Sequence, residues 1–254
     1  MNSIKDKLTA GKAVYGSFFE LGSGAAMEAM GIAGLDFAII DCEHGPFNPQ
    51  VTMEWVRAAE VRNIVPFARI QEISRASVLK MLDIGVKGLI VPCVHSVEEV
   101  KDLIKWAKYA PMGERGFFTA RPAGYGHDLG DASISQYMES TNKGNMLIPQ
   151  CETLGALNVI EEIMGLKGVD GIFVGPFDLS IAMGIPGDFH NPKFQQALDR
   201  IVKAAKNENK PAFIYAPNTL AAKEQMERGY QGIAISMDVG ILIDGYKSLL
   251  AQLK

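Results

Sequence analysis

Two carboxylates follow short apolar segments in the second half of this sequence. Glu152 comes directly after residues 146–151, and Asp178 ends the turn Gly175-Pro176-Phe177-Asp178 after another such segment. Carboxylate oxygens bind Mg²⁺ or Mn²⁺, and a site with few protein ligands leaves its other positions to water and substrate. The pair predicts a divalent-metal site, with two solvated loop carboxylates as the alternative.

A histidine and an arginine follow two earlier apolar segments. His44 lies just after Asp41 and Glu43, and a neighbouring carboxylate raises the basicity of an imidazole, as a general base near neutral pH requires. Arg69 ends a segment that begins at Val65, and its guanidinium could bind a carboxylate or a developing enolate oxygen. A structural histidine, and an ion pair of Arg69 with Asp41 or Glu43, remain open as alternatives.

Eight short apolar, β-branched or aromatic segments alternate with helical patterns along the chain. Such alternation predicts a parallel sheet covered by helices, and eight units are the number that closes a barrel. We therefore expect residues 1–254 to form one (β/α)₈ TIM barrel, with its active site at the carboxyl ends of the strands. The expected strands are Val14–Phe19, Phe37–Asp41, Val65–Ile70, Gly88–Val94, Met146–Cys151, Gly171–Gly175, Ala212–Ala216 and Gly232–Ser236.

Helix signals and two long gaps complete this arrangement. Asn48-Pro49 and Asn191-Pro192 predict capped helix starts, and Ser96 with Glu99 predicts a capping box. Extra length at about 110–145 and at 178–190 marks candidate covers of the active site, since long loops in a compact domain are usually functional. The sequence assigns no functional role to five side chains in or near these gaps, namely His95, Arg115, Arg121, His127 and His190.

Composition excludes several classes of protein. With 48% hydrophobic and 21% charged residues the chain can fold around a core, and a net charge of −4 gives no reason to expect nucleic acid as a partner. The sequence shows no signal-peptide pattern and no apolar run of the length a membrane helix needs, about 18 residues. We expect a cytoplasmic protein with no membrane partner, in which Cys42, Cys93 and Cys151 are reduced, buried thiols.

Four segments, in this order, resemble the HpcH/HpaI aldolase family. The resemblance runs from about Gly16 to Ser236, and parts of it are shared by the wider phosphoenolpyruvate/pyruvate barrel superfamily. The segments are Asp41-Cys42-Glu43-His44-Gly45-Pro46, Tyr109-Ala110-Pro111-Met112-Gly113-Glu114-Arg115-Gly116, Gln150-Cys151-Glu152 and Gly175-Pro176-Phe177-Asp178-Leu179-Ser180.

The resemblance implies a divalent-metal-dependent, or class II, aldolase. Such a carbon–carbon lyase cleaves a 4-hydroxy-2-oxo acid, of the 4-hydroxy-2-oxoheptanedioate or 2-keto-3-deoxy sugar acid type, reversibly to pyruvate and an aldehyde. The metal would be Mg²⁺, Mn²⁺ or Co²⁺, and aromatic or sugar-acid catabolism would be the context. The family is typically hexameric, so a homo-oligomer is implied.

The same resemblance assigns roles to residues. His44 would be the base, Arg69 would stabilise the enolate oxygen, and Glu152 and Asp178 would bind the metal. Gln150 and the backbone amides of Phe177 and Asp178 would hold the pyruvate end. Asp83 would reach the histidine of a neighbouring subunit.

Three other functions stay open. A Schiff-base aldolase would need a lysine on a strand, but none of the eight segments contains one, and Lys87 precedes the fourth at the wrong end. A lyase acting on an acyl-coenzyme A thioester, like the citrate lyase β-subunit, would share the barrel and the paired carboxylates. A non-catalytic barrel that binds a small acid would take up pyruvate without cleaving anything.

Overall fold

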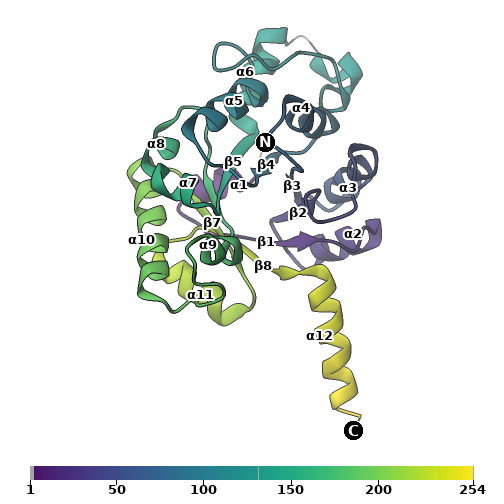
Figure 1. Ribbon diagram of the computed structural model, residues 1–254. Coiled ribbons are helices and arrows are strands. Elements are labelled where there is room, and N and C mark those ends of the chain that lie inside the picture. The colour runs from purple at the N-terminus through teal and green to yellow at the C-terminus, as the bar shows by residue number, and fades with distance from the viewer. Residues whose placement is uncertain (1–2, 131, 254) are drawn as a thin grey trace.

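The computed structural model describes residues 3–130 and 132–253, which form one closed parallel barrel (Figure 1). Its strands lie in sequence order, and each pairs in parallel with the next, while β8 pairs with β1. The expected single-domain TIM barrel is confirmed. The strands are β1 Val14–Phe19, β2 Phe37–Asp41, β3 Val65–Arg69, β4 Gly88–Val91, β5 Met146–Cys151, β6 Ile172–Val174, β7 Ala212–Ala216 and β8 Gly232–Met237.

Helices cover the outside of this barrel, and their starts follow the sequence signals. Asn48 and Asn191 cap helices that begin at Pro49 and Pro192, and Ser96 with Glu99 forms the expected capping box. The helices are α1 Ser3–Thr9, α2 Gly24–Ile32, α3 Pro49–Val61, α4 Arg75–Ile84, α5 Val97–Ala107, α6 Ile134–Gly144, α7 Leu154–Asn158, α8 Ile160–Gly165, α9 Pro176–Ala182, α10 Pro192–Asn207, α11 Thr219–Arg228 and α12 Asp238–Ala251, with the 3-10 segment η1 Arg121–Leu129.

The barrel interior is filled by large rings that lie opposite glycines. Phe37, Phe67 and Phe213 pack with ring centroids 5.1–6.2 Å apart. Each ring belongs to a residue whose register partner on the adjacent strand is a glycine, in the pairs Gly16–Phe37, Phe67–Gly88 and Phe213–Gly232. A Cβ at position 232 would lie 1.8 Å from the Phe213 ring, so the glycine is what admits the ring.

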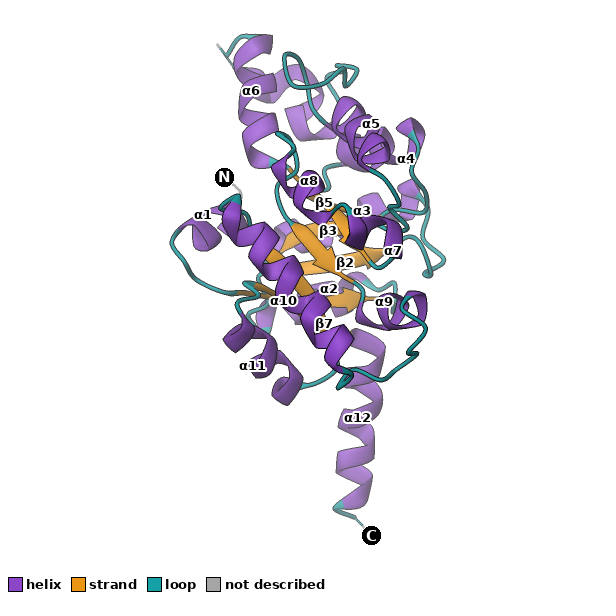
Figure 2. Cartoon of the chain, turned by 60° about the vertical axis from the view of Figure 1, so that its left-hand side comes forward, coloured by secondary structure: helices purple, strands orange, loops and turns teal. Residues whose placement is uncertain are grey.

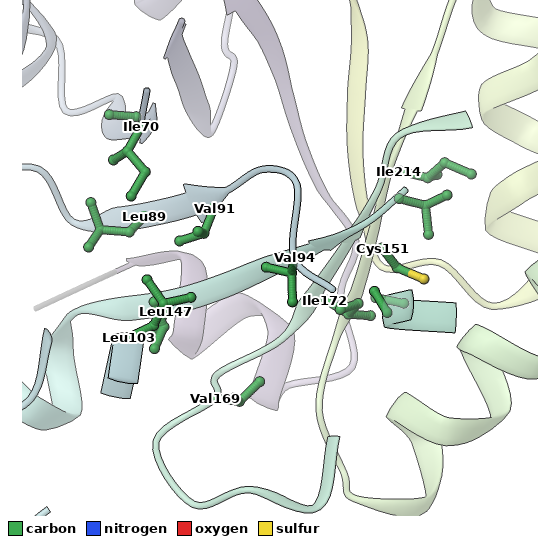
Figure 3. Close-up of a cluster of buried hydrophobic side chains, with 14 of the residues drawn as sticks. Ile70, Leu89, Val91, Val94, Leu103, Leu147, Cys151, Val169, Ile172 and Ile214 are labelled. Carbon is green, nitrogen blue, oxygen red and sulfur yellow. The ribbon is translucent and has the colours of Figure 1, made fainter. Parts of the chain in front are cut away.

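A second apolar layer lies between the sheet and the helices. Alternate strand residues point outward into it, so Ile172 and Val174 of β6 face the helices while Phe173 faces the barrel interior. Figure 3 shows part of this layer, with Leu89, Leu147 and Cys151 among the buried side chains. The cysteine is a packing residue, and burial raises the pKa of its thiol to about 12.

The fourth strand is shorter than expected, ending at Val91 rather than Val94. Pro92 carries no N–H to continue the ladder, and Cys93 adopts a left-handed conformation with φ 54°. Cys93 is exposed beside Glu43, so the expectation that all three cysteines are buried is wrong for this one.

The segment at 110–145 does not cover the active-site mouth of its own chain. It follows α5, contains η1 and α6, and returns to the amino-terminal start of β5. Arg115 binds Asp83 near the end of α4, and Arg121 binds Glu60 near the end of α3. Since each of these helices runs back from the carboxyl end of the preceding strand, the segment lies at the amino-terminal end of the barrel.

The last helix leaves the barrel. Figures 1 and 2 show α12 projecting away from the rest of the chain, and every residue from 241 to 253 is exposed. Among these are several large apolar side chains, namely Ile241, Leu242, Ile243, Tyr246, Leu249, Leu250 and Leu253. In the described part of the chain, no helix has the length and apolar character needed to cross a bilayer.

Replacing Gly232 with alanine should destabilise the barrel, because the new methyl group would overlap the Phe213 ring. Overpacking of this kind typically costs about 1–3 kcal/mol. Urea unfolding of Gly232→Ala would measure the loss. Gly165→Ala is the matched control, because outside its chain neighbours and the backbone of its own helix no described atom lies within 4 Å of its Cβ position; equal stabilities of the two variants would contradict the packing argument.

Candidate active site

A cavity of about 320 Å³ opens at the carboxyl ends of the strands. Five of the residues expected to form the site line it, and they come from loops and strand ends far apart in sequence. These are His44, Arg69, Gln150, Phe177 and Asp178. The expectation that strand ends bring these side chains to one mouth is therefore confirmed for this set.

An ion pair between Arg69 and Asp41 fixes one side of the mouth. The two residues are register partners at the ends of β3 and β2. Arg69 donates from Nε to Asp41 Oδ1 at 2.9 Å and from Nη2 to Oδ2 at 2.6 Å, and its Nε also lies 3.2 Å from Glu43 Oε2. Burial alone would raise the pKa of Asp41, but the guanidinium outweighs it and holds that pKa below its usual value.

Asp41 also positions the turn that carries His44. Its Oδ1 accepts hydrogen bonds from the backbone N–H groups of Glu43, at 3.1 Å, and His44, at 3.3 Å. The imidazole itself remains 69% exposed, with Nε2 3.9 Å from Glu43 Oε2. His44 thus faces the cavity with its ring free to meet a substrate.

Two carboxylates that were not among the expected site residues complete this wall. Glu20 lines the cavity after β1, and burial together with the adjacent Asp41 carboxylate raises the pKa of Glu20 to about 8. Asp238, after β8, accepts hydrogen bonds from the backbone N–H groups of Glu20 and Leu21 at 2.9 and 3.0 Å. Glu20 follows the expected strand Val14–Phe19 directly, so the rule that found Glu152 would have found it too, whereas Asp238 comes two residues after the expected end at Ser236.

Glu152 lies behind the cavity, only 5% exposed. Its Oε1 accepts a hydrogen bond from the backbone N–H of Cys93 at 2.6 Å, and Gln150 Nε2 donates to its Oε2. Burial raises the pKa of Glu152, and repulsion from Glu43 and Asp178 adds to the rise. Three carboxylates are thus close enough to repel each other, and a divalent cation would relieve that repulsion.

The residues present fit a metal held by two protein carboxylates. Gly175 brings the backbone close to Glu152 and Gln150, because a Cβ at Gly175 would lie 2.7 Å from Glu152 Oε2 and 2.6 Å from Gln150 Nε2. Buried Gln150 Oε1 has no hydrogen-bond partner among the described residues. No group of three or more His, Cys, Asp or Glu able to hold a metal occurs in residues 3–130 and 132–253. Water and substrate oxygens would therefore have to complete a shell begun by Glu152 and Asp178.

Aromatic side chains also line the cavity. Phe18 contacts Tyr215 with ring centroids 5.9 Å apart, and Tyr215 contacts Phe177 at 6.2 Å. Phe177 in turn packs edge-on against Phe189 at 5.0 Å, so the segment after β6 adjoins the cavity through Phe177. The Arg69 guanidinium lies 4.9 Å from the centre of the Phe18 ring.

Several other candidates lie outside this cavity. Asp83, near the end of α4, is paired with Arg115 at 2.8 Å, and so lies at the opposite end of the barrel from His44 of the same chain. The exposed side chains of His95, His127 and His190 do not line it either.

Comparison with known proteins agrees with this geometry. Residues 15–245 match the pattern described as HpcH/HpaI aldolase/citrate lyase. The chain is 30% identical to a hydroxypyruvate/pyruvate aldolase of Agrobacterium fabrum, over all of this chain and 94% of that one. It is also 30% identical to a 4-hydroxy-2-oxo-heptane-1,7-dioate aldolase of Escherichia coli, over 99% and 94% of the two chains. A crystal structure of an HpcH/HpaI aldolase/citrate lyase family protein from Burkholderia cenocepacia superposes with a TM-score of 0.91, at 29% identity, covering 100% and 99% of the two chains.

The fold and site thus define a barrel lyase that breaks a carbon–carbon bond. The chain belongs to the HpcH/HpaI aldolase/citrate lyase family. The expected family and enzyme class are confirmed.

The raised pKa of Glu20 predicts a specific dependence of stability on pH. Because this pKa is about 8 in the folded protein against a usual 4.5, the contribution of protonated Glu20 is complete below about pH 4.5 and is lost as pH rises through 8. Glutamine mimics the protonated form, so the melting temperature of Glu20→Gln should fall less than that of the wild type between pH 6 and pH 9. Equal slopes in metal-free thermal scans would contradict the assignment.

Proposed function

We propose that the protein is a divalent-metal-dependent aldolase that cleaves a 4-hydroxy-2-oxo acid reversibly to pyruvate and an aldehyde. The observation that carries this proposal is that Arg69, His44, Gln150 and Asp178 line one cavity, with Glu152 behind it and hydrogen-bonded to Gln150. This set offers a metal site and a base to one small substrate. The Agrobacterium and E. coli relatives support the same reaction class.

Arg69 stabilises the negative charge that develops on the 2-oxo oxygen. Its Nε and Nη2 are held by Asp41, which fixes the plane of the guanidinium. Nη1 has no hydrogen bond to a described residue, so its two N–H groups remain for the substrate. A donor fixed in advance stabilises the charge without reorganising during the reaction.

His44 accepts the proton of the 4-hydroxyl group as the C3–C4 bond breaks. The electron pair of that bond passes to C3 and gives the enolate of pyruvate, while C4 leaves as an aldehyde. The exposed ring and the adjacent Glu43 carboxylate suit a group that must take up and return a proton.

Gln150 and the start of α9 hold the pyruvate end. The backbone N–H groups of Phe177 and Asp178 lie in the first turn of α9, where no helical carbonyl accepts from them. A divalent metal bound at Glu152 and Asp178, Mg²⁺, Mn²⁺ or Co²⁺, would supply Lewis-acid polarisation of the 2-oxo group.

Charge in the cavity argues against an acyl-coenzyme A substrate. Arg69 is the one Lys or Arg that lines it within the described residues, and Asp41 already binds it. A nucleotide with several phosphates needs more cationic contacts than this. The substrate is therefore a small 2-oxo acid of the 4-hydroxy-2-oxoheptanedioate or 2-keto-3-deoxy sugar acid type, from aromatic or sugar-acid catabolism.

The active form is a homo-oligomer, for which we propose a hexamer. The apolar side chains of α12 from Ile241 to Leu253 are exposed in the described chain, and burying such a surface favours association. Asp83 lies too far along the barrel to reach His44 of its own chain, so its role is to contact the His44 of a second copy.

Pyruvate release should require the metal and the side chains of Glu152 and Arg69. Measured with lactate dehydrogenase on a panel of 4-hydroxy-2-oxo acids, release should stop with EDTA, return with Mg²⁺, Mn²⁺ or Co²⁺, and be lost in Glu152→Gln.

Arg69→Lys keeps a charge beside Asp41 but loses the planar donors, so turnover should fall roughly 10² to 10³ fold, the effect of about 2.7–4 kcal/mol for one oxyanion donor.

Glu139→Gln is the matched control, because Glu139 is an exposed carboxylate on α6 that binds only Lys143 in the described structure. It should cleave the same acids at the wild-type rate. Release that persists after chelation would refute the metal mechanism.

Charging the apolar face of α12 should disrupt the assembly. Leu249→Glu is expected to give a smaller species by light scattering on a sizing column, with loss of turnover because Asp83 no longer meets a second His44. Lys247→Glu alters charge on the same helix without removing an apolar contact, and should remain assembled. A fully active monomer of Leu249→Glu would contradict both the assembly and the role of Asp83.

A further inference from the structure

A second cavity, of about 850 Å³, lies at the opposite end of the barrel. It shares no lining residue with the active-site cavity. Its walls come from the starts of β3 and β4, the ends of α3 and α4, and from α1 and α6. It is therefore separate from the aldolase site of the same chain.

Lys87, at the start of β4, is an unpaired cation on this cavity. Its side chain is largely buried and makes no hydrogen bond or ion pair with any residue that the structure describes. Burial lowers its pKa, and the nearby positive charges of Arg121 and Arg115 lower it further, against the opposing effect of Glu60. Because it has no partner in the described structure, the Lys87 ammonium has three N–H donors available for a ligand.

Arg115 is a second cation on the same cavity with unused donors. Its side chain is 98% buried, since only 2% is exposed, and it lies over the Tyr109 ring with 4.6 Å between Cζ and the ring centroid. Nη2 donates to Asp83, but Nε and Nη1 have no partner in the described part of the chain. Buried guanidinium donors without partners are costly, so an acceptor at this position would stabilise the structure.

The neighbouring cations already have carboxylates. Lys5 and Lys108 both bind Asp170, each at 2.6 Å, and Arg121 binds Glu60. Asp6 also lines the cavity, but it is exposed on α1 and forms no ion pair with Lys87 in the described structure. The space beside Lys87 therefore offers two cations, Lys87 and Arg115, to an anion.

The remaining wall of the cavity is largely apolar. Ile64, Pro66, Leu82 and Pro122 line it together with the ring of Tyr137. An inorganic ion would leave this surface and most of the volume to water. A ligand with an apolar body would use both parts of the cavity.

We propose that this cavity is a second binding site, which takes an organic oxyanion, a carboxylate or phosphate on an apolar or aromatic body, with its head group between Lys87 and Arg115. The strands β3 and β4 begin at this site, and β3 ends at Arg69 of the active site.

Isothermal titration calorimetry with benzoate and with phenyl phosphate tests the proposal on the full-length, metal-free protein. The two probes share one apolar body, so their relative affinities identify the head group. Lys87→Met should weaken binding at least tenfold, as expected for loss of a charge-assisted hydrogen bond, and Lys87→Arg should retain it. Removing an unpaired buried ammonium should not lower the melting temperature of Lys87→Met.

Two controls separate this site from its surroundings and from the aldolase site. Lys143→Met changes an exposed lysine at the cavity rim that is paired with Glu139, and should bind the probes like the wild type. Glu152→Gln alters only the aldolase site and should also bind normally. Binding that disappears in Glu152→Gln, binding unchanged in Lys87→Met, or no binding by the wild type would overturn the proposal.

Discussion

The bidentate ion pair between Arg69 and Asp41 is the interaction on which the active-site mouth depends. It forms because β2 and β3 pair in a register that places the two residues side by side. The Asp41 carboxylate also accepts hydrogen bonds from the backbone N–H groups of the turn that carries His44. Arg69 uses Nε and Nη2 for Asp41 and keeps Nη1 for the substrate. One buried carboxylate thus orients both the base and the enolate-stabilising group.

Charge around Glu152 is arranged in the opposite sense. Glu43, Glu152 and Asp178 repel one another, and burial adds to the cost of ionising Glu152. Such an arrangement is unfavourable for the chain by itself and becomes favourable with a divalent cation. The aromatic rings of Phe18, Tyr215 and Phe177 line the same cavity, and an apolar wall strengthens these electrostatic effects.

The two ends of the barrel have different chemistry for a structural reason. Parallel strands place every carboxyl end at one mouth, where loops carry the acids and His44. The amino-terminal end receives the helix ends and the start of β4, and with them Arg115, Arg121 and Lys87. The long excursion between α5 and β5 closes around this second end and binds back to α3 and α4, so its cations are used there and not at the aldolase site.

The sequence by itself determined the architecture and most of the mouth. Apolar segments at regular spacing indicate strands, and a residue that directly follows a strand must lie at its end, so the order of residues alone assigns His44, Arg69, Gln150, Glu152 and Asp178 to the mouth. Tertiary structure decided what depends on side-chain direction and on contacts between distant segments. Four features do not follow from local pattern, because each depends on which residue of another segment lies opposite. They are the exposure of Cys93, the Phe213 ring over Gly232, the raised pKa of Glu20 beside Asp41, and the pairing of Arg115 with Asp83.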